Sequence, residues 1–379
     1  MINLARLSGF KKFTSTASNL KFFDLFKRFY LRSVYFPPDL VRNHQKFYQQ
    51  NYLKYIYGKV PINPSLLDAD MSSFSLNEYF ASNKSKELEK LINAINQFID
   101  DKNCLVLEIK GLNQDVNLTL DHQALSKNLL VCGLINKFNF VRTKHNGSLV
   151  LGSINELGEL KKNSDYLPLW PHFDAISANL IPQYVAIVNI VSNDDAQTFF
   201  VDNQKIIENM AKQYPKELSI LLGTKIIVKE FNRSHNVFST SKQSFSVVER
   251  NEVGEFTINL FSDRFKMLVV SETQTTNDEF IKAVSALKAV AIEHKEKMKV
   301  VLNSDNQVVF FKNLSLLHGR SALSIDKIRE VNYLPFDDSV KKNIMTNSIN
   351  NFVQQPSNSP LKSLDKFSKL KASPLRFLS

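Results

Sequence analysis

Two short motifs, far apart in the chain, contain residues that could bind one metal ion together. The first is Trp170-Pro-His172-Phe-Asp174, in which one residue separates a histidine from an aspartate. On a β-strand, side chains two residues apart project to the same face, so His172 and Asp174 could share an ion. The second motif, Leu317-His318-Gly-Arg320, follows an apolar run. Two imidazoles and one carboxylate on a β framework form the facial triad that suits non-haem Fe(II).

A second interpretation of these motifs is possible from the residues alone. A histidine two residues before an aspartate is a common pattern, and a buried histidine that hydrogen-bonds beside a turn would give the same sequence. Other chemistries are easier to exclude. The two cysteines, Cys104 and Cys132, lie in apolar runs and offer neither a disulfide framework nor a cysteine zinc site. The chain has ten glycines and no G-x-G-x-x-G or P-loop motif, which argues against a phosphate-binding enzyme.

The elements that would position these residues can be predicted from hydrophobic periodicity. Apolar runs bounded by turn residues predict strands over 104–110, 148–152, 184–191, 225–229, 245–248, 255–261 and 307–312. Helical spacing predicts helices over 20–30, 73–101, 123–140, 204–213 and 277–298. We expect Pro37 and Pro38 to end the first of these helices. Many short strands with helices before them and one long helix late in the chain predict a β-barrel or sandwich with helical cladding.

The sequence around the two motifs resembles that of a known family. Trp170-Pro-His172-Phe-Asp174-Ala, Pro182-Gln-Tyr-Val-Ala-Ile-Val-Asn189 and Asp195-Ala-Gln-Thr198 are similar to the Fe(II)/2-oxoglutarate-dependent oxygenases of the taurine dioxygenase superfamily. Gln307-Val-Val-Phe-Phe-Lys-Asn313, followed by Leu317-His318-Gly-Arg320-Ser-Ala, is similar to the same family. The resemblance extends from about residue 75 to 340 and is strongest to the clavaminate synthase and L-asparagine oxygenase branch.

This resemblance implies a fold and a set of ligands. The fold would be a double-stranded β-helix, or jelly roll, that is mainly β with flanking helices. Fe(II) would be held at one open end by His172, Asp174 and His318. The co-substrate 2-oxoglutarate would chelate the iron, with its distal carboxylate on Arg329 and a contact from the Thr198 hydroxyl. Arg320 would support the site or contact substrate.

The function that this resemblance implies is the oxidation of an unactivated C–H bond. We expect a hydroxylation coupled to the conversion of 2-oxoglutarate and O₂ to succinate and CO₂. Relatives in this branch act on amino acids, so the expected substrate is an amino acid or a related small polar molecule. Two alternatives stay open: a catalytically inactive jelly-roll protein with a binding or regulatory role, and a peripheral membrane-associated protein that uses basic tails.

The charge of the chain is concentrated at its two ends. The 379 residues contain 48 Lys+Arg and 37 Asp+Glu, a formal net charge of +11. Residues 1–32 have a local excess of six positive charges and residues 355–379 an excess of four. The middle of the chain is therefore nearly neutral, and we expect no nucleic-acid binding there. We predict a basic amphipathic extension over 1–36, an oxygenase domain over 37–354 and a flexible basic tail over 355–379.

The same features predict where the protein resides. No stretch has the roughly twenty consecutive apolar residues that span a bilayer, and lysines interrupt the beginning of the chain, unlike a secretory signal. We expect a cytoplasmic protein, with organelle targeting by the basic extension as the alternative. The tails could make weak contacts with an anionic surface.

Overall fold

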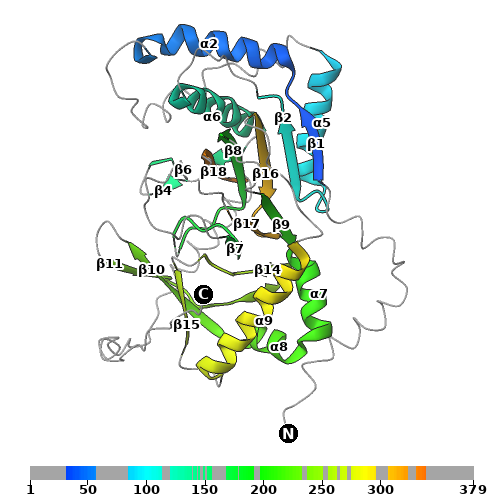
Figure 1. Ribbon diagram of the computed structural model, residues 1–379, viewed down its shortest axis with the longest axis vertical. Helices are drawn as coiled ribbons and strands as arrows, with labels where there is room; N and C mark the ends of the chain where they lie inside the picture. Colours follow the sequence, from blue (N-terminus) through cyan, green and yellow to red (C-terminus); the bar gives the residue numbers. More distant parts are fainter. Residues whose placement is uncertain are drawn as a thin grey trace, which may run out of the picture. The chain divides into compact units, whose positions relative to one another are not determined.

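A computed structural model of the chain describes most of the predicted oxygenase domain (Figure 1). The described residues are 31–56, 84–112, 120–138, 140–142, 144–145, 148–149, 152–155, 168–177, 179–191, 197–232, 237–250, 255–262, 265–270, 275–295, 306–322 and 330–338. The predicted helix over 20–30 and the predicted tail over 355–379 lie outside these residues. No described helix is long and apolar enough to cross a membrane.

The largest sheet has seven strands and is antiparallel except at one edge. Its order is β1-β2-β16-β8-β18-β3, and β6 also pairs with β18. Its central strands match the prediction: β2 covers Val106–Lys110, β8 covers Tyr184–Val191 and β16 covers Gln307–Lys312. The other strands are β1 (Leu31–Tyr35), β3 (Phe140–Arg142), β6 (Gly152–Asn155) and β18 (Glu330–Asp338).

The beginning of the sheet differs from the prediction. Strand β1 lies within the predicted extension 1–36 and pairs in parallel with β2, so residues 31–35 are part of the sheet. We expected the two prolines to follow a helix, but strand β1 lies directly before them, and Pro38 begins the helix α2 (Pro38–Ile56). The physical reason is that the first turn of a helix has no intrahelical acceptor for its N–H groups, so proline is tolerated there.

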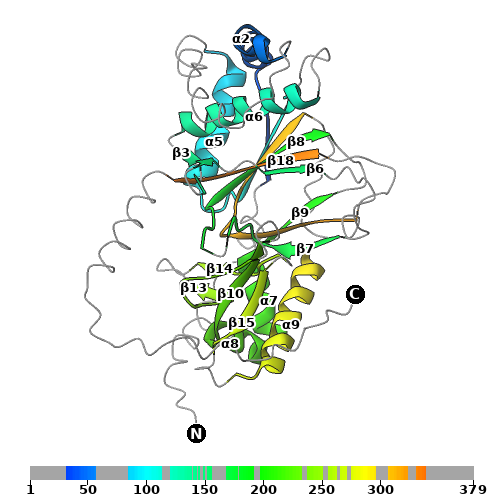
Figure 2. The same cartoon turned by 90° about the vertical axis from the view of Figure 1, so that its left-hand side faces the viewer.

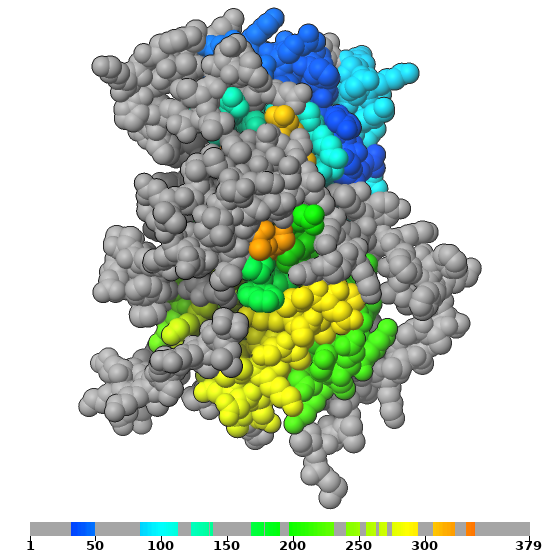
Figure 3. Space-filling model, in the orientation of Figure 1, coloured from blue at the N-terminus to red at the C-terminus, as the bar shows by residue number. Residues whose placement is uncertain are grey.

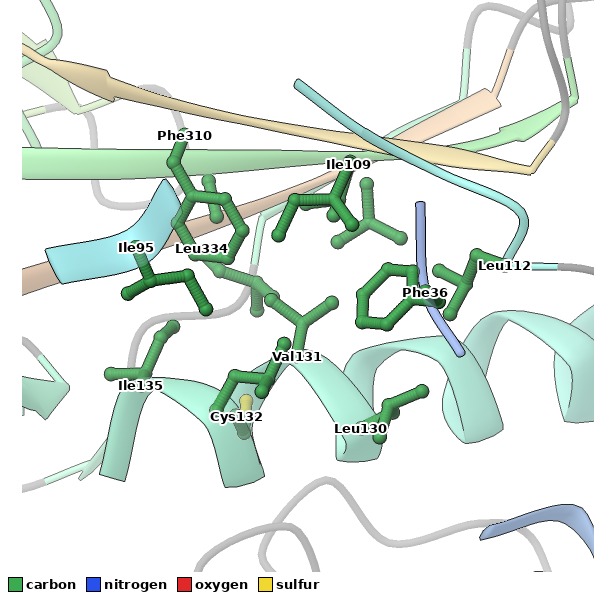
Figure 4. Close-up of a cluster of buried hydrophobic side chains, with 14 of the residues drawn as sticks. Phe36, Ile95, Ile109, Leu112, Leu130, Val131, Cys132, Ile135, Phe310 and Leu334 are labelled. Carbon is green, nitrogen blue, oxygen red and sulfur yellow. The ribbon is translucent and has the colours of Figure 1, made fainter. Parts of the chain in front are cut away.

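Three helices cover one face of this sheet, the outer face. They are α5 (Lys86–Asp100) and α6 (Leu120–Lys137), which pack on the sheet, and α2, which packs on α6. The apolar stripe of α5 (Leu88, Leu91, Ala94, Ile95 and Phe98) is buried, as its periodicity predicts, although the helix is shorter than the predicted 73–101. Figure 4 shows how side chains of α6, such as Val131 and Ile135, meet Phe310 and Leu334 from the sheet.

A smaller sheet of three antiparallel strands lies against the opposite, inner face. Its order is β7-β17-β9, with β7 at Leu169–His172, β9 at Thr198–Asp202 and β17 at Leu316–Arg320. Phe200 and Leu316 of this sheet share one buried cluster with Val185, Val309 and Phe311 of the large sheet. Two sheets that enclose a common core agree with the predicted jelly roll, and Figure 2 shows β7 and β9 below β8 and β18.

A long insertion between β9 and β16 packs on the outer side of the three-stranded sheet. It contains the helices α7 (Asn203–Gln213), α8 (Pro215–Gly223) and α9 (Asn277–Lys295). Its main sheet joins β10 (Lys225–Asn232), β11 (Val237–Thr240), β12 (Phe245–Ser246) and β15 (Phe265–Val269). The strands β13 (Val248–Arg250) and β14 (Phe256–Ile258) pair with each other, as do β4 (Lys144–His145) and β5 (Ser148–Leu149) outside the insertion. A second hydrophobic core fills this part and includes Phe199 and Leu317 of the three-stranded sheet.

Candidate metal centre

The three-stranded sheet places the two histidines of the separate motifs directly opposite each other. His318 of β17 pairs with His172 of β7, although the two residues are remote in sequence. Their ring centroids are 4.6 Å apart. Directly opposite residues of an antiparallel pair project to the same face, so both rings lie on the inner face of this sheet.

Asp174 completes the group just beyond the end of β7. Its Oδ1 lies 4.0 Å from His172 Nε2 and its Oδ2 lies 3.2 Å from His318 Nε2. Within the described residues, these three side chains form a group that could hold a metal ion, with the ligand atoms within 4.8 Å of one another. We predicted that a strand would place His172 and Asp174 on one face. The structure has both side chains on one side of the chain with Phe173 between them on the other, although β7 itself ends at His172.

Hydrogen bonding and burial leave both histidines suited to bind a metal. His172 Nδ1 lies 2.7 Å from the carbonyl oxygen of Trp170. Since that oxygen can only accept, Nδ1 carries the proton, and the Nε2 lone pair faces the group. Burial lowers the pKa of His318 to about 3. Desolvation is the cause, and it favours the neutral ring, which is the form that binds a metal.

The residue between two of these side chains anchors them to the insertion. Phe173 is 2% exposed, and its ring meets the Phe261 ring at a centroid distance of 4.6 Å in an edge-on arrangement. Its N–H donates to the carbonyl oxygen of Leu260 at 3.1 Å. Because Phe173 belongs to the insertion core while its neighbours face the metal group, the core of the insertion holds the H-F-D segment in place.

The other predicted site residues fall into two sets. Arg320 and Thr198 are opposite each other in the β17–β9 pairing and are both buried. Arg320 is two residues after His318 on β17, and Thr198 is two residues before Phe200, the partner of His318, on β9. Because side chains alternate along a strand, both project to the inner face that carries the metal group. The guanidinium of Arg320 donates to the carbonyl oxygen of Ser321 at 3.0 Å. Arg329 lies outside the described residues, so its predicted role stays a prediction.

Gly319 occupies the position between His318 and Arg320, where the backbone faces the insertion. A Cβ at this position would lie 2.4 Å from Phe199 Cζ and 2.6 Å from the carbonyl oxygen of Leu169. A side chain at residue 319 would therefore collide with the neighbours on both sides of β17. The glycine of the His-Gly-Arg motif thus allows three strands to approach closely at the metal group.

A fully buried asparagine supports the group from behind, and our reading of the sequence gave it no role beyond a turn. Asn313 is in the turn between β16 and β17 and is 0% exposed. Its side chain accepts from the N–H of Asp174 and donates to the carbonyl oxygen of the same residue, both at 2.8 Å. A turn-forming asparagine after an apolar strand is the one signal that the sequence offers, and it does not reveal these contacts.

The chain belongs to a family of dioxygenases. The model of the taurine catabolism dioxygenase TauD, TfdA family matches residues 83–332, which is more than half of the chain. This family belongs to the predicted superfamily, so that prediction is confirmed, as is the prediction of a dioxygenase. The placement in the clavaminate synthase and L-asparagine oxygenase branch stays a prediction. No curated protein matches the chain.

The solved structures that align with this chain are distant from it in sequence. The non-heme iron oxygenase OrfP in complex with Fe and alpha-ketoglutaric acid aligns with a TM-score of 0.53 and 12% identity, over 83% of this chain and 96% of OrfP. Its complex with Fe, succinate and (3R,4R)-dihydroxy-L-Arg gives a TM-score of 0.51 and 14% identity, over 82% and 95%. The PvcB protein from Pseudomonas aeruginosa gives a TM-score of 0.44 and 13% identity, over 63% and 78%. The OrfP matches confirm the predicted fold class.

Proposed function

We propose that this protein is an Fe(II)- and 2-oxoglutarate-dependent oxygenase that hydroxylates an unactivated C–H bond of an amino acid or a related small polar molecule. The observation that carries the proposal is the group of His172, Asp174 and His318, whose ligand atoms lie within 4.8 Å of one another. The family match agrees with this activity, as does the fold shared with OrfP, which was solved with Fe, alpha-ketoglutaric acid and arginine derivatives.

The donor set of this group fits the proposed metal. Two neutral imidazole nitrogens and one carboxylate are the ligands of non-haem Fe(II) sites, and they leave further coordination positions for co-substrate and O₂. A thiolate site is excluded here because both cysteines are buried elsewhere, with Cys132 in the cluster beneath the outer face of the large sheet. In the proposed enzyme, Fe(II) would supply the centre at which O₂ oxidises 2-oxoglutarate to succinate and CO₂ and the substrate C–H to C–OH.

The chain itself would position the reactants and limit access of water. The metal would be held from one side by His172, Asp174 and His318. These residues belong to the edge strand β7, the segment directly after it, and the central strand β17, and the outer face of this sheet packs on the insertion. Phe200 and Phe311 surround the His318 ring at centroid distances of 6.2 and 4.9 Å. These two rings help to bury the His318 side chain, which favours its neutral form.

The buried guanidinium of Arg320 and the hydroxyl of Thr198 share the inner face with the metal group. A cation on this face suits a carboxylate of the co-substrate or the substrate, because a guanidinium forms charge-assisted hydrogen bonds with carboxylates. Arg329 stays the proposed partner of the distal carboxylate of 2-oxoglutarate. If Arg320 and not Arg329 binds that carboxylate, Arg320→Lys will raise the KM for 2-oxoglutarate far more than Arg329→Lys does.

The side of the centre next to β7 reaches the surface. Leu169 and Trp170 are large apolar side chains that are 43% and 47% exposed. In Figure 3 the green atoms of this part of the chain lie at the surface beside the yellow helix α9.

The proposed location is the cytoplasm, with organelle targeting as the alternative, and this proposal rests on the sequence.

The test of the proposed function is substrate-stimulated succinate formation. The purified chain, supplied anaerobically with Fe(II) and then with 2-oxoglutarate and air, is screened against amino acids and their small polar derivatives. We expect one or more of these to raise succinate release, and His172→Ala to abolish both the release and Fe(II) binding. A chain that binds no Fe(II), and that releases no succinate with any pool, would refute the proposal and favour the inactive jelly-roll alternative.

A further inference from the structure

A single buried amide joins the segments that carry two of the three proposed ligands. Both hydrogens of Asn313 Nδ2 are used, one on the carbonyl oxygen of Asp174 and one on that of Pro182, each at 2.8 Å. Asn313 Oδ1 accepts from the N–H of Asp174 at 2.8 Å, and the Asn313 N–H donates to the carbonyl oxygen of Gln183 at 2.9 Å. Two donors and one acceptor of a single side chain are thus fully used by backbone groups.

The pattern of these bonds restricts Asp174 more than a single contact would. The amide contacts Asp174 on both its N–H and its carbonyl group, and a two-point contact limits rotation as well as displacement of that residue. The same amide holds the chain at Pro182, immediately before strand β8. Asp174 lies beyond the end of β7, so these bonds support it at a position outside the β-ladder that holds His172.

The turn that contains Asn313 also leads directly to His318. From the other side, the Asn203 N–H donates to the carbonyl oxygen of Ser315 at 3.1 Å, and Asn203 Nδ2 donates to that of Leu314 at 3.0 Å. The turn is therefore fixed between Asp174 and the start of α7. Because β17 begins at the next residue, Leu316, the position of His318 depends on the same turn.

We infer that Asn313 is a positioning residue, which sets the Asp174 carboxylate at the distance from His318 that metal binding requires. This inference rests on the proposed function, since it assumes that the triad binds Fe(II). Asn313 does not contact the metal in this arrangement, because its polar atoms are occupied by the backbone. It acts through the peptide groups on either side of the Asp174 Cα.

The test compares two near-isosteric substitutions of buried asparagines. Asn313→Asp keeps the shape but places a carboxylate oxygen against the carbonyl oxygens of Asp174 and Pro182. The matched control is Asn203→Asp, which loses the equivalent donor to the same turn without touching a ligand-bearing residue. The readouts are Fe(II) affinity by anaerobic calorimetry, the absorption spectrum of the Co(II)-substituted protein, and denaturant unfolding of the metal-free protein.

We expect Asn313→Asp to weaken Fe(II) binding by about 10–100-fold, the range found when the groups that orient metal ligands are removed. Its Co(II) spectrum should change, because the carboxylate no longer has the same position. Asn203→Asp, which breaks one side-chain hydrogen bond to the turn, should lose some stability and keep the wild-type affinity and spectrum. Asn313→Ser, which retains one donor and no charge, should lie between the wild type and Asn313→Asp.

Three results would overturn the inference. The first is wild-type affinity in Asn313→Asp and Asn313→Ser. The second is an equal loss of affinity in Asn203→Asp, which would show that any weakening of the turn has this effect. The third is the loss of fold in both Asn313 variants, which would make the residue generally structural. Failure of the proposed function is distinguishable from all three, because in that case the wild type itself binds no Fe(II).

Discussion

The substitution Gly319→Ala tests whether close strand packing holds the metal group together. The added Cβ would lie 2.4 and 2.9 Å from two atoms of the Phe199 ring and 2.6 Å from the carbonyl oxygen of Leu169. Since carbon contacts are favourable at about 3.5 Å or more, the ring must move by about 1 Å, and strand β7 by somewhat less. The ring belongs to the close-packed insertion core, and the oxygen belongs to the backbone that leads to His172. Neither neighbour can move without cost.

The expected cost has two components that can be measured separately. Overpacking of this kind lowers the free energy of unfolding by about 1–3 kcal/mol. Displacement of β7 moves His172 away from His318, and we expect Fe(II) affinity to fall by about tenfold. Denaturant unfolding of the metal-free protein measures the first component, and anaerobic calorimetry measures the second. The backbone at Gly319 is outside the left-handed region, so lack of space is the cause in both cases.

Two further variants separate this cause from others. Gly223→Ala, at the end of α8, adds a Cβ with no atom within 4 Å, so it should be neutral or slightly stabilising. Adding Phe199→Leu to Gly319→Ala removes the collision with the ring but not the one with Leu169. That double variant should recover part of the stability and none of the metal affinity. The reasoning would be refuted if Gly319→Ala had a free energy of unfolding within about 0.5 kcal/mol of the wild type and an unchanged Fe(II) affinity.

Three other predictions concern a buried histidine, an anchor and a helix cap. Burial lowers the pKa of His44 to about 4 from 6.5, so the unfolded chain takes up the proton first. Stability is then lost as the pH falls through 6.5 towards 4, by about 3 kcal/mol in total, and His44→Gln should remove this component of the pH profile. Phe173→Leu should lower the free energy of unfolding by about 1–2 kcal/mol and also weaken Fe(II) binding. Phe261→Leu, in the same ring pair, should lower the free energy of unfolding by a similar amount and leave Fe(II) affinity unchanged. Ser85→Ala removes the side chain that caps α5 through the Leu88 N–H and should cost about 1 kcal/mol without any effect on Fe(II) binding.

Each of these three predictions has a result that would contradict it. The His44 prediction is contradicted if denaturant unfolding shows the same difference in the free energy of unfolding between wild type and His44→Gln at every pH from 7 to 4. For the anchor, both phenylalanine variants would alter Fe(II) affinity equally, and Phe173 would then have no special position between the ligands. For the cap, calorimetry of Ser85→Ala would show weaker Fe(II) binding, which would mean that α5 is coupled to the metal group.

The sequence contains enough information to predict the main strands and the residues of the metal group. Strand β8 was predicted with its observed bounds, because an apolar run of eight residues that is rich in valine and isoleucine is too short for a typical helix and fits a buried strand. The three metal-group residues were predicted from their motifs, and the structure brings them together. Their role as metal ligands stays a prediction until Fe(II) binding is measured.

Other features depend on contacts that no local pattern contains. Strands β7 and β17 are short, and each is defined by the partner that it pairs with. The contacts of Asn313 could not be predicted, because they join residues about 130–140 positions apart whose approach only the assembled fold determines. The helix that begins at Pro38 was not predicted, because a proline can stand after one helix or in the first turn of the next, and the sequence alone does not distinguish the two.

The chain order of the three-stranded sheet has a consequence for how the protein is made. The edge strands β7 and β9 are synthesised before the insertion, and the central strand β17, which carries His318, is synthesised after it. A nascent chain that ends within the insertion therefore lacks the third of the proposed metal ligands and has two strands without the strand that joins them. The long sequence separation also predicts slow folding. Tight retention of iron should accordingly be a late event in biosynthesis, which limits uncontrolled reaction of a half-folded enzyme with oxygen.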